Sequence, residues 1–396
     1  MPLSHSEGTR RHAAICEALA LDDLDALVVL APENFYYVTN FLLDVDTWER
    51  PVAAIIPRDG TPKLVLNELS TTYLQLAAGR GTCWVTDAEI YAEHPQVSRR
   101  GYLITEWDRM LSEVLADMGL DRGRLGFDRL GLLHPGVPAR LPRAELTEVA
   151  ELLQSLRSIK SDEEIALMRA CGQATDWAQE RFGAHVKPGI HIKSACLEVA
   201  RLLGNHLIER YPDSEIRVMV EGSTGIASAS PHHAGLGSGT RFAAGDNVVN
   251  FIAVRMDGYF VENERTYFVG SAAPEQRRYF ESMLAAHDAA LAQMREGRRI
   301  CDIDSAGQEV FERTGYGHLI LHRSGHGMGI GGHEYPLDMS FNVRPLRRNM
   351  VISCEPSIYV SGLGGFRHSD SVVIGEAEPM RLTNSPTDID SLITAG

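Results

Sequence analysis

The first 150 or so residues alternate short apolar segments with helical segments, and this alternation constrains the fold more than any other feature. Helical spacing of apolar residues predicts helices at 8–20 and 105–120. Short, apolar segments predict buried strands at 25–30, 51–57, 62–67 and 124–128. Strands that alternate with helices in this way indicate an α/β layer.

A second pattern begins at the segment LRSIKSDEEIALMRAC, residues 156–171. Ser161 and Glu164 have the spacing of a capping box, in which each side chain bonds a free backbone amide at the start of a helix. Further helices are predicted at 190–210, 274–297 and 303–314, and strands at 216–222, 247–254, 259–269, 349–360 and 371–375. Helices packed on one antiparallel sheet make an α+β domain, so we expect domains at 1–157 and 158–396.

Composition supports two soluble domains and excludes several classes of partner. The 396 residues are 44% hydrophobic, which suffices for two cores. A net charge of -15 argues against nucleic acid and against an anionic membrane. The six cysteines form no CxxC pair, which favours free buried thiols in a reducing cytoplasm. The sequence holds no long uncharged apolar run, and the polar N-terminus has no signal-peptide core.

Four segments occur in an order that is typical of one family. They are ENFYYVTNF (33–41), DGYFVENERT (257–266), HRSGHGMGIGGHE (322–334) and CEPSIYV (354–360). On these motifs the chain resembles the pita-bread hydrolases of the M24 family, which comprises aminopeptidase P, prolidase and creatinase. The resemblance implies a creatinase N-terminal-like α/β domain followed by an α+β pita-bread catalytic domain. It also implies a homodimer.

The same resemblance identifies five positions that ligate two metal ions in the metallopeptidases of the family. His326 and Glu355 match. Phe251 stands where the first aspartate is expected, Glu262 replaces the second, and Ser369 replaces the last glutamate. Two divalent ions need several anionic oxygen ligands, so a dinuclear site is implausible. The pattern resembles creatinase, a metal-free member, and we therefore expect neither a metal nor another cofactor.

Glu262 and Glu355 form the centre of the expected catalytic site. Two carboxylates that face one pocket raise each other's proton affinity unless a cation lies between them. A metal ion can be that cation, and so can a guanidinium, whose N–H pairs match carboxylate oxygens in bidentate geometry.

Histidines are expected to complete the site. By the resemblance, His232 or His233 in SPHHAG is the acid–base group, and we favour His232 as catalytic and His233 as substrate-binding. An imidazole titrates near neutral pH and can carry a proton to a leaving nitrogen. His326 is grouped with the catalytic residues, and the family pattern makes His322 and His333 substrate-binding.

Three further positions are expected to bind substrate. Trp48 and Arg50 in DTWERPVAA resemble the creatinase segment whose arginine binds the substrate carboxylate. Tyr259 precedes Glu262 in the same motif. A second carboxylate-binding arginine of creatinase is missing, since Leu337 and Asp338 occupy that region.

The favoured hypothesis is a metal-independent C–N hydrolase of a small guanidino or amidino compound, as in the conversion of creatine to sarcosine and urea. One alternative is an ectoine-hydrolase-like enzyme that acts on a compatible solute. Another is an Xaa-Pro dipeptidase with a single metal on Glu262, His326 and Glu355. A binding module that has lost catalysis is a fourth possibility, which the retained histidines and glutamates disfavour.

Overall fold

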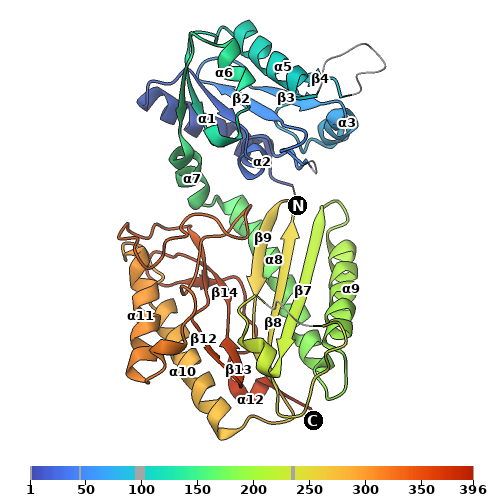
Figure 1. Cartoon of the computed structure of the whole chain (residues 1–396), viewed down its shortest axis with the longest axis vertical. Coiled ribbons are helices and arrows are strands. Elements are labelled where there is room, and N and C mark those ends of the chain that lie inside the picture. Colours follow the sequence, from blue (N-terminus) through green and yellow to red (C-terminus); the bar gives the residue numbers. More distant parts are fainter. Residues whose placement is uncertain (1, 44–45, 94–102, 233–236, 396) are drawn as a thin grey trace. The chain divides into compact units, whose positions relative to one another are not determined.

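The structure is a computed structural model that describes residues 2–43, 46–93, 103–232 and 237–395. The chain divides into two units, Pro2–Arg157 and Ser158–Gly396. Each unit has its own sheet, and each is shown in Figure 1.

The N-terminal unit is built on a mixed six-stranded sheet of order β4-β3-β2-β1-β5-β6. Strand β1 pairs antiparallel with β2 and parallel with β5. The strands are β1 (Ala26–Val29), β2 (Ala53–Pro57), β3 (Lys63–Asn67), β4 (Ala88–Tyr91), β5 (Arg124–Phe127) and β6 (Glu145–Glu148). The helices are α1 (His5–Leu21), α2 (Pro32–Thr39), α3 (Ser70–Arg80), α5 (Leu103–Asp117), η1 (Leu130–Leu132), α6 (Gly136–Arg140) and α7 (Ala150–Ser158).

One core cluster of this unit lies between the sheet and helix α5. Val28, Ile55 and Val65 from three neighbouring strands are fully buried together with Trp107 and Leu111 of α5. The apolar strand segments seen in the sequence therefore supply one layer, and the helical segment that follows them supplies the next.

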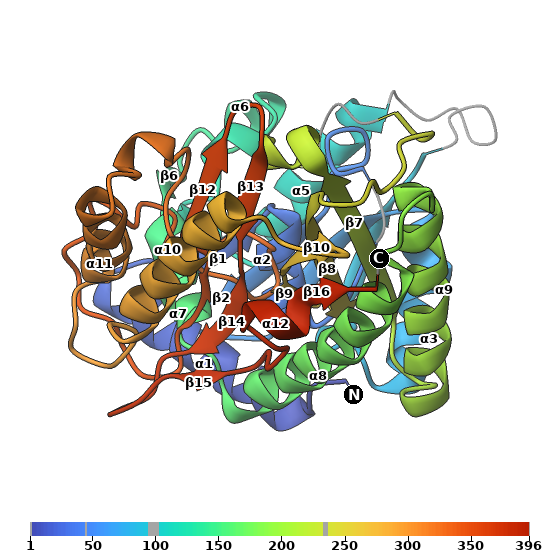
Figure 2. The same ribbon diagram turned by 90° about the horizontal axis from the view of Figure 1, so that it is seen from below.

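The C-terminal unit places α8 and α9 against an antiparallel sheet in which β8 pairs with β7, β9 and β10 (Figures 1 and 2). Its strands are β7 (Ile216–Thr224), β8 (Asn247–Met256), β9 (Tyr259–Asn263), β10 (Thr266–Val269), β11 (Val351–Cys354), β12 (Ser357–Val360), β13 (Gly364–Arg367), β14 (Asp370–Val373), β15 (Met380–Arg381) and β16 (Ile393–Thr394). Its helices are α8 (Asp162–His185), α9 (Ile192–Arg210), η2 (Gly225–Ala229), α10 (Pro274–Leu291), α11 (Ile300–Arg313), η3 (Gly317–Leu319) and α12 (Ile389–Leu392).

The start of α8 follows the capping box of the sequence. Ser161 Oγ accepts the Glu164 amide at 3.3 Å, and Glu164 Oε2 accepts the Ser161 amide at 2.7 Å. The helix runs 24 residues, and buries Met168, Cys171 and Phe182 on the side that packs against β8 and β9.

Two segments that we predicted as single strands are each broken in the middle. Residues 259–269 form β9 and β10 with Glu264 and Arg265 between them, and residues 349–360 form β11 and β12 with Glu355 and Pro356 between them. Each break leaves a buried glutamate outside the regular ladder. Glu264 and Glu355 therefore lie at the two breaks, with their side chains in the interior.

No helix among the described residues is long and apolar enough to cross a membrane. All six cysteines are free thiols; five are buried, and Cys16 is half-buried.

Candidate functional site

Strand β9 directs Glu262 into the C-terminal unit's cavity. The β8–β9 hairpin turns at Asp257 and Gly258, both with positive φ, and pairs Glu262 with Ala253. Side chains alternate along a strand, so Tyr259 faces the other way. Its hydroxyl donates to Glu164 Oε1 at 2.7 Å in the interior. The structure does not bring Tyr259 to the site.

The segment that carries His326 passes close to two other backbones. The His326 amide donates to Ser353 Oγ at 3.0 Å, and the Ser353 amide donates to the His326 carbonyl at 2.8 Å. A Cβ on Gly325 would lie 2.1 Å from the backbone carbonyl oxygen of Ser353. One on Gly327 would lie 2.2 Å from the backbone carbonyl oxygen of Tyr335. Glycines on both sides of the histidine are therefore required for this approach.

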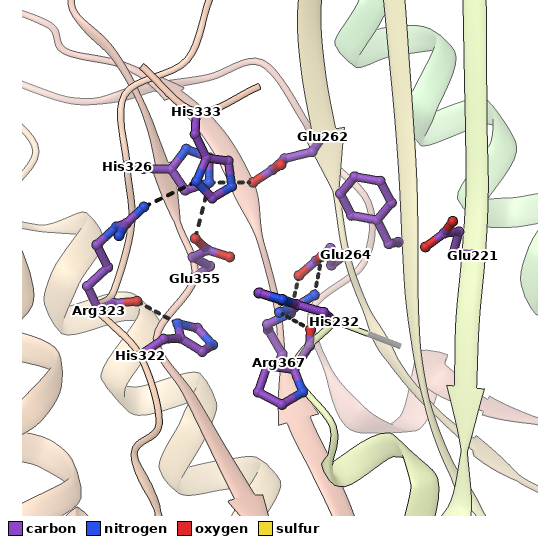
Figure 3. A pocket seen from close by; sticks show the side chains of 12 residues that line it. Glu221, His232, Glu262, Glu264, His322, Arg323, His326, His333, Glu355 and Arg367 are labelled. Carbon is purple, nitrogen blue, oxygen red and sulfur yellow. Dashed lines mark hydrogen bonds and ion pairs between the residues drawn. The ribbon is translucent and has the colours of Figure 1, made fainter. Parts of the chain in front are cut away.

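Glu262, His326 and Glu355 form a buried cluster whose donor atoms all lie within 4.8 Å of one another (Figure 3). His326 Nε2 is 3.4 Å from Glu262 Oε1 and 3.3 Å from Glu355 Oε1. Ligand atoms set tetrahedrally about 2.1 Å from an ion lie about 3.4 Å apart. The spacing of these donors therefore fits one divalent ion.

The hydrogen bonds of His326 support the same conclusion. Its Nδ1 lies 3.1 Å from the Gly327 carbonyl, which can only accept, so Nδ1 carries the hydrogen. The Nε2 lone pair then faces the two carboxylates. A carbonyl that orients a histidine in this way is the usual outer partner of a metal ligand.

The charges of the cluster also favour a cation between the two carboxylates. Burial lowers the pKa of His326, but Glu262 and Glu355 outweigh it and raise the pKa to about 9. Burial would raise the pKa of Glu355, yet His326 and its other cationic neighbours hold it below its usual value. The two carboxylates therefore favour a positive charge at Nε2, which either a proton or a metal ion can supply.

The residues around the cluster do not fit a second ion. Phe251 of β8 lines the cavity with a side chain that has no donor atom. Ser369 offers only a neutral hydroxyl, which donates to Glu262 Oε1 at 3.3 Å. The site thus has the ligands for one ion and lacks the carboxylates for two.

His322 and His333 are both neutral, and their hydrogen bonds define which ring nitrogen carries the hydrogen. His322 Nδ1 donates to the Arg323 carbonyl at 2.7 Å, so its Nε2 accepts from the Tyr359 hydroxyl at 2.8 Å. His333 Nδ1 accepts from Arg323 Nη2 at 3.2 Å, which leaves a hydrogen on its Nε2. Burial lowers the pKa of both imidazoles. His333 also stacks on His326, with ring centroids 3.7 Å apart.

Sequence reasoning missed an ion pair in the same cavity, formed by Glu264 and Arg367 (Figure 3). Arg367 Nη1 also donates to the Pro231 carbonyl at 2.9 Å, beside His232. Burial raises the pKa of Glu264, as do Glu355 and Glu262, although Arg367 opposes the shift. The period of a strand could have found Glu264, because it lies two residues after Glu262 and so shares its face.

The cavity has a volume of about 430 Å³. His232 lines it with an exposed side chain, whereas His233 lies outside the described residues. The described lining residues are Glu221, Pro231, His232, Phe251, Glu262, Glu264, His322, Arg323, His326, His333, Glu355 and Arg367. The predicted site residues of the C-terminal unit thus come together, apart from Tyr259 and the undescribed His233.

Trp48 and Arg50 belong to the other unit. The Trp48 side chain is 80% exposed and borders a separate cavity of about 300 Å³. Arg50 is paired with two carboxylates, Glu93 at 2.7 Å and Glu49 at 2.6 Å. Its guanidinium is therefore already occupied on both sides.

Comparison with known proteins shows two matching families of domain. Residues 166–376 match metallopeptidase family M24, and residues 11–159 match the creatinase/prolidase N-terminal domain. The Xaa-Pro dipeptidase of Pyrococcus furiosus is 30% identical over 245 residues, which is 62% of this chain and 68% of that protein. The uncharacterized peptidase YqhT of Bacillus subtilis is 29% identical, over 80% of this chain and 89% of that protein.

Solved structures show the same fold. The crystal structure of dipeptidase PepE from Mycobacterium ulcerans superposes with a TM-score of 0.82 at 24% identity, covering 99% of both chains. At that identity the likeness speaks for the fold alone.

These findings correct our expectation of function. The curated relatives are named as a dipeptidase and a peptidase, and the family model is that of a metallopeptidase, so the prediction of a metal-independent, creatinase-like amidinohydrolase is wrong. The physical reason lies in the cluster. We interpreted two missing carboxylates as the loss of every metal, but the three remaining donors keep the spacing and tautomer that one ion needs.

Proposed function

The chain belongs to the metallopeptidase family M24, whose model covers more than half of it, and from that membership we propose a metal-dependent dipeptidase. Its substrates would be Xaa-Pro dipeptides, and one divalent ion would be held by Glu262, His326 and Glu355. The name of the Pyrococcus furiosus relative supports the substrate class. The single observation that carries the proposal is the geometry of His326, whose Nε2 lies 3.3 and 3.4 Å from oxygens of two carboxylates.

A divalent ion in such a site supplies Lewis acidity, which polarises a carbonyl and makes a nucleophile available near neutral pH. The protein's own residues would orient the substrate and move the protons. His333 offers an Nε2 hydrogen next to the cluster, suited to the substrate's carbonyl oxygen. His232 lines the same cavity and would return a proton to the leaving nitrogen.

Glu264 and Arg367 would shape the site without contacting the reacting bond. Arg367 joins Glu264 to the Pro231 carbonyl, and so ties the residue before His232 to the acidic side of the cavity. We also retain the homodimer as part of the proposal, to be checked by sedimentation of the purified protein.

The test compares hydrolysis of Ala-Pro by protein stripped with a chelator and by the same protein reloaded with Mn²⁺ or Zn²⁺. We expect turnover only after reloading. Glu355→Gln should lower kcat/KM at least about 100-fold, because it removes an anionic ligand. Arg278→Gln, an exposed change on α10, should leave activity unchanged. Full activity in the stripped protein would refute the proposal.

A further inference from the structure

The substrate's C-terminal carboxylate would enter a cavity that already contains several acidic side chains. A free dipeptide carries this negative charge about 4 Å from its scissile carbonyl carbon, roughly one Cα–Cα step along the chain. The cavity already contains Glu262, Glu264 and Glu355. Like charges at this range repel, so a dipeptide needs a cation of the protein at its acidic end.

Most basic side chains that line the cavity already have partners. Arg367 is buried, pairs with Glu264, and donates to the Pro231 carbonyl and the Tyr359 hydroxyl. His326 faces the acidic cluster. His322 has a partner on each ring nitrogen.

Arg323 differs from them, because no carboxylate within the described part of the chain pairs with it. Its Nε donates to the Gly325 carbonyl at 3.0 Å, and its Nη2 donates to His333 Nδ1 at 3.2 Å. Both partners are neutral acceptors. They fix the direction of the guanidinium but do not neutralise its positive charge. Its Nη1 has no partner among the described residues.

Arg323 lies close to the proposed reaction centre. Its Nη2 contacts His333, and His333 stacks on His326, whose ring belongs to the acidic cluster. The guanidinium is therefore one imidazole ring away from the proposed reaction centre. Figure 3 shows the Arg323 head directed toward His326 and His333, beside Glu355.

The backbone on both sides of Arg323 is held in place, so that its guanidinium needs little ordering when a ligand binds. The Arg323 carbonyl accepts from His322 Nδ1 at 2.7 Å, and the Ser324 amide donates to Asp304 Oδ1 at 2.7 Å. Pre-organisation of this kind reduces the entropy lost on binding.

We propose that Arg323 binds the C-terminal carboxylate of the substrate and so restricts the enzyme to free dipeptides. The inference rests on the proposed dipeptidase function. A longer peptide would bring a neutral peptide group to this position and lose the charged hydrogen bonds. Arg50, which the sequence suggested for the same task, is already paired with Glu49 and Glu93.

Binding to protein stripped of metal tests the inference without turnover. Calorimetry would compare Ala-Pro with its C-terminal amide, Ala-prolinamide. Wild-type protein should bind the acid about 10- to 100-fold more tightly than the amide, the range expected for a charged hydrogen-bonded pair. In Arg323→Gln this preference should vanish. Arg323→Lys should keep part of it, since lysine retains the charge but not the bidentate geometry.

Arg278→Gln on the exposed face of α10 is the matched control, since it removes an equal charge away from the cavity. An unchanged preference for the acid in Arg323→Gln would overturn the inference, and so would equal binding of acid and amide by the wild type. Turnover by the reloaded enzyme tests the proposed function separately. A protein that prefers the acid through Arg323 but never cleaves it would refute the dipeptidase and leave the carboxylate subsite standing.

Discussion

At the scale of single residues, the site is defined by three residues that can bind a metal ion and by two neighbours that carry no charge. Glu262, His326 and Glu355 have the spacing for one ion, whereas Phe251 and Ser369 contribute no charge. The residue types could be read from the sequence. The tautomer of His326 could not, because it depends on the Gly327 carbonyl 3.1 Å from Nδ1.

Restoring both missing carboxylates should create a second metal position. The double change Phe251→Asp and Ser369→Glu should raise the metal content from about one to about two ions per chain, because two ions share several anionic ligands. Elemental mass spectrometry of protein dialysed against Mn²⁺ measures this. The control pair Phe251→Ala and Ser369→Ala opens the same space without charge and should stay near one. An unchanged content in the acidic pair would contradict our account of these positions.

The buried thiols should resist alkylation. Burial disfavours the thiolate and raises the pKa of Cys83 to about 11 and the pKa values of Cys171 and Cys196 to about 12. Because the thiolate is the nucleophile, these groups react slowly below their pKa values and faster as the pH rises. At pH 8, iodoacetamide should modify them only after unfolding, as judged by mass spectrometry. Rapid modification in the native protein would show that these thiols are accessible.

At the scale of elements, the sequence predicted the central strands and the long helices. It did not predict shorter elements such as α3, β4 and β6, and it missed two breaks where the chain bends to build the site. The segments 259–269 and 349–360 look continuous by hydrophobicity, yet each is interrupted at a glutamate that lines the cavity. Periodicity reports burial, and both halves of each segment are buried, so the break leaves no mark in the pattern.

Helix α2 was missed for a related reason. Residues 33–41 are rich in aromatic residues, which favour strands, but Pro32 at the first turn and dense burial of Phe35 to Val38 produce a helix. Tertiary packing overrides local preference here.

Arg265 holds the broken strands together and should be important for stability. It pairs with Asp370 at 2.8 Å, with both side chains fully buried, and donates to the carbonyls of Ser369, Ser385 and Pro386. Burial would raise the pKa of Asp370, but Arg265 keeps it well below its usual value. Asp370 therefore stays ionised at neutral pH. Its contribution to stability is complete above the pKa of an aspartate in the unfolded chain and is lost progressively as the pH falls below that value.

Arg265→Met should lower the free energy of unfolding by about 3–5 kcal/mol, because it leaves Asp370 charged and less compensated in the interior. Urea unfolding followed by circular dichroism measures the loss. Arg278→Met, an exposed arginine on α10, should change it by less than about 0.5 kcal/mol. Equal effects of the two changes would show that the buried pair does not hold the strands.

At the scale of the whole molecule, the sequence motifs indicated the family and the fold, and the comparisons confirm both. The predicted chemistry was wrong, because the motifs show which ligands are lost and not how the remaining ones are arranged. Distances between Glu262, His326 and Glu355 depend on three segments that are far apart in the sequence. Spacing along the chain therefore carries no information about whether one ion still fits.

The most direct test of the central claim is a titration of metal-free enzyme with Mn²⁺ while Ala-Pro hydrolysis is followed. At protein concentrations well above the dissociation constant, activity should rise from zero in a straight line. It should stop rising at about one ion per chain, because Glu262, His326 and Glu355 provide the donors for one ion. Activity before any metal is added, or a rise that continues to two ions per chain, would contradict the account.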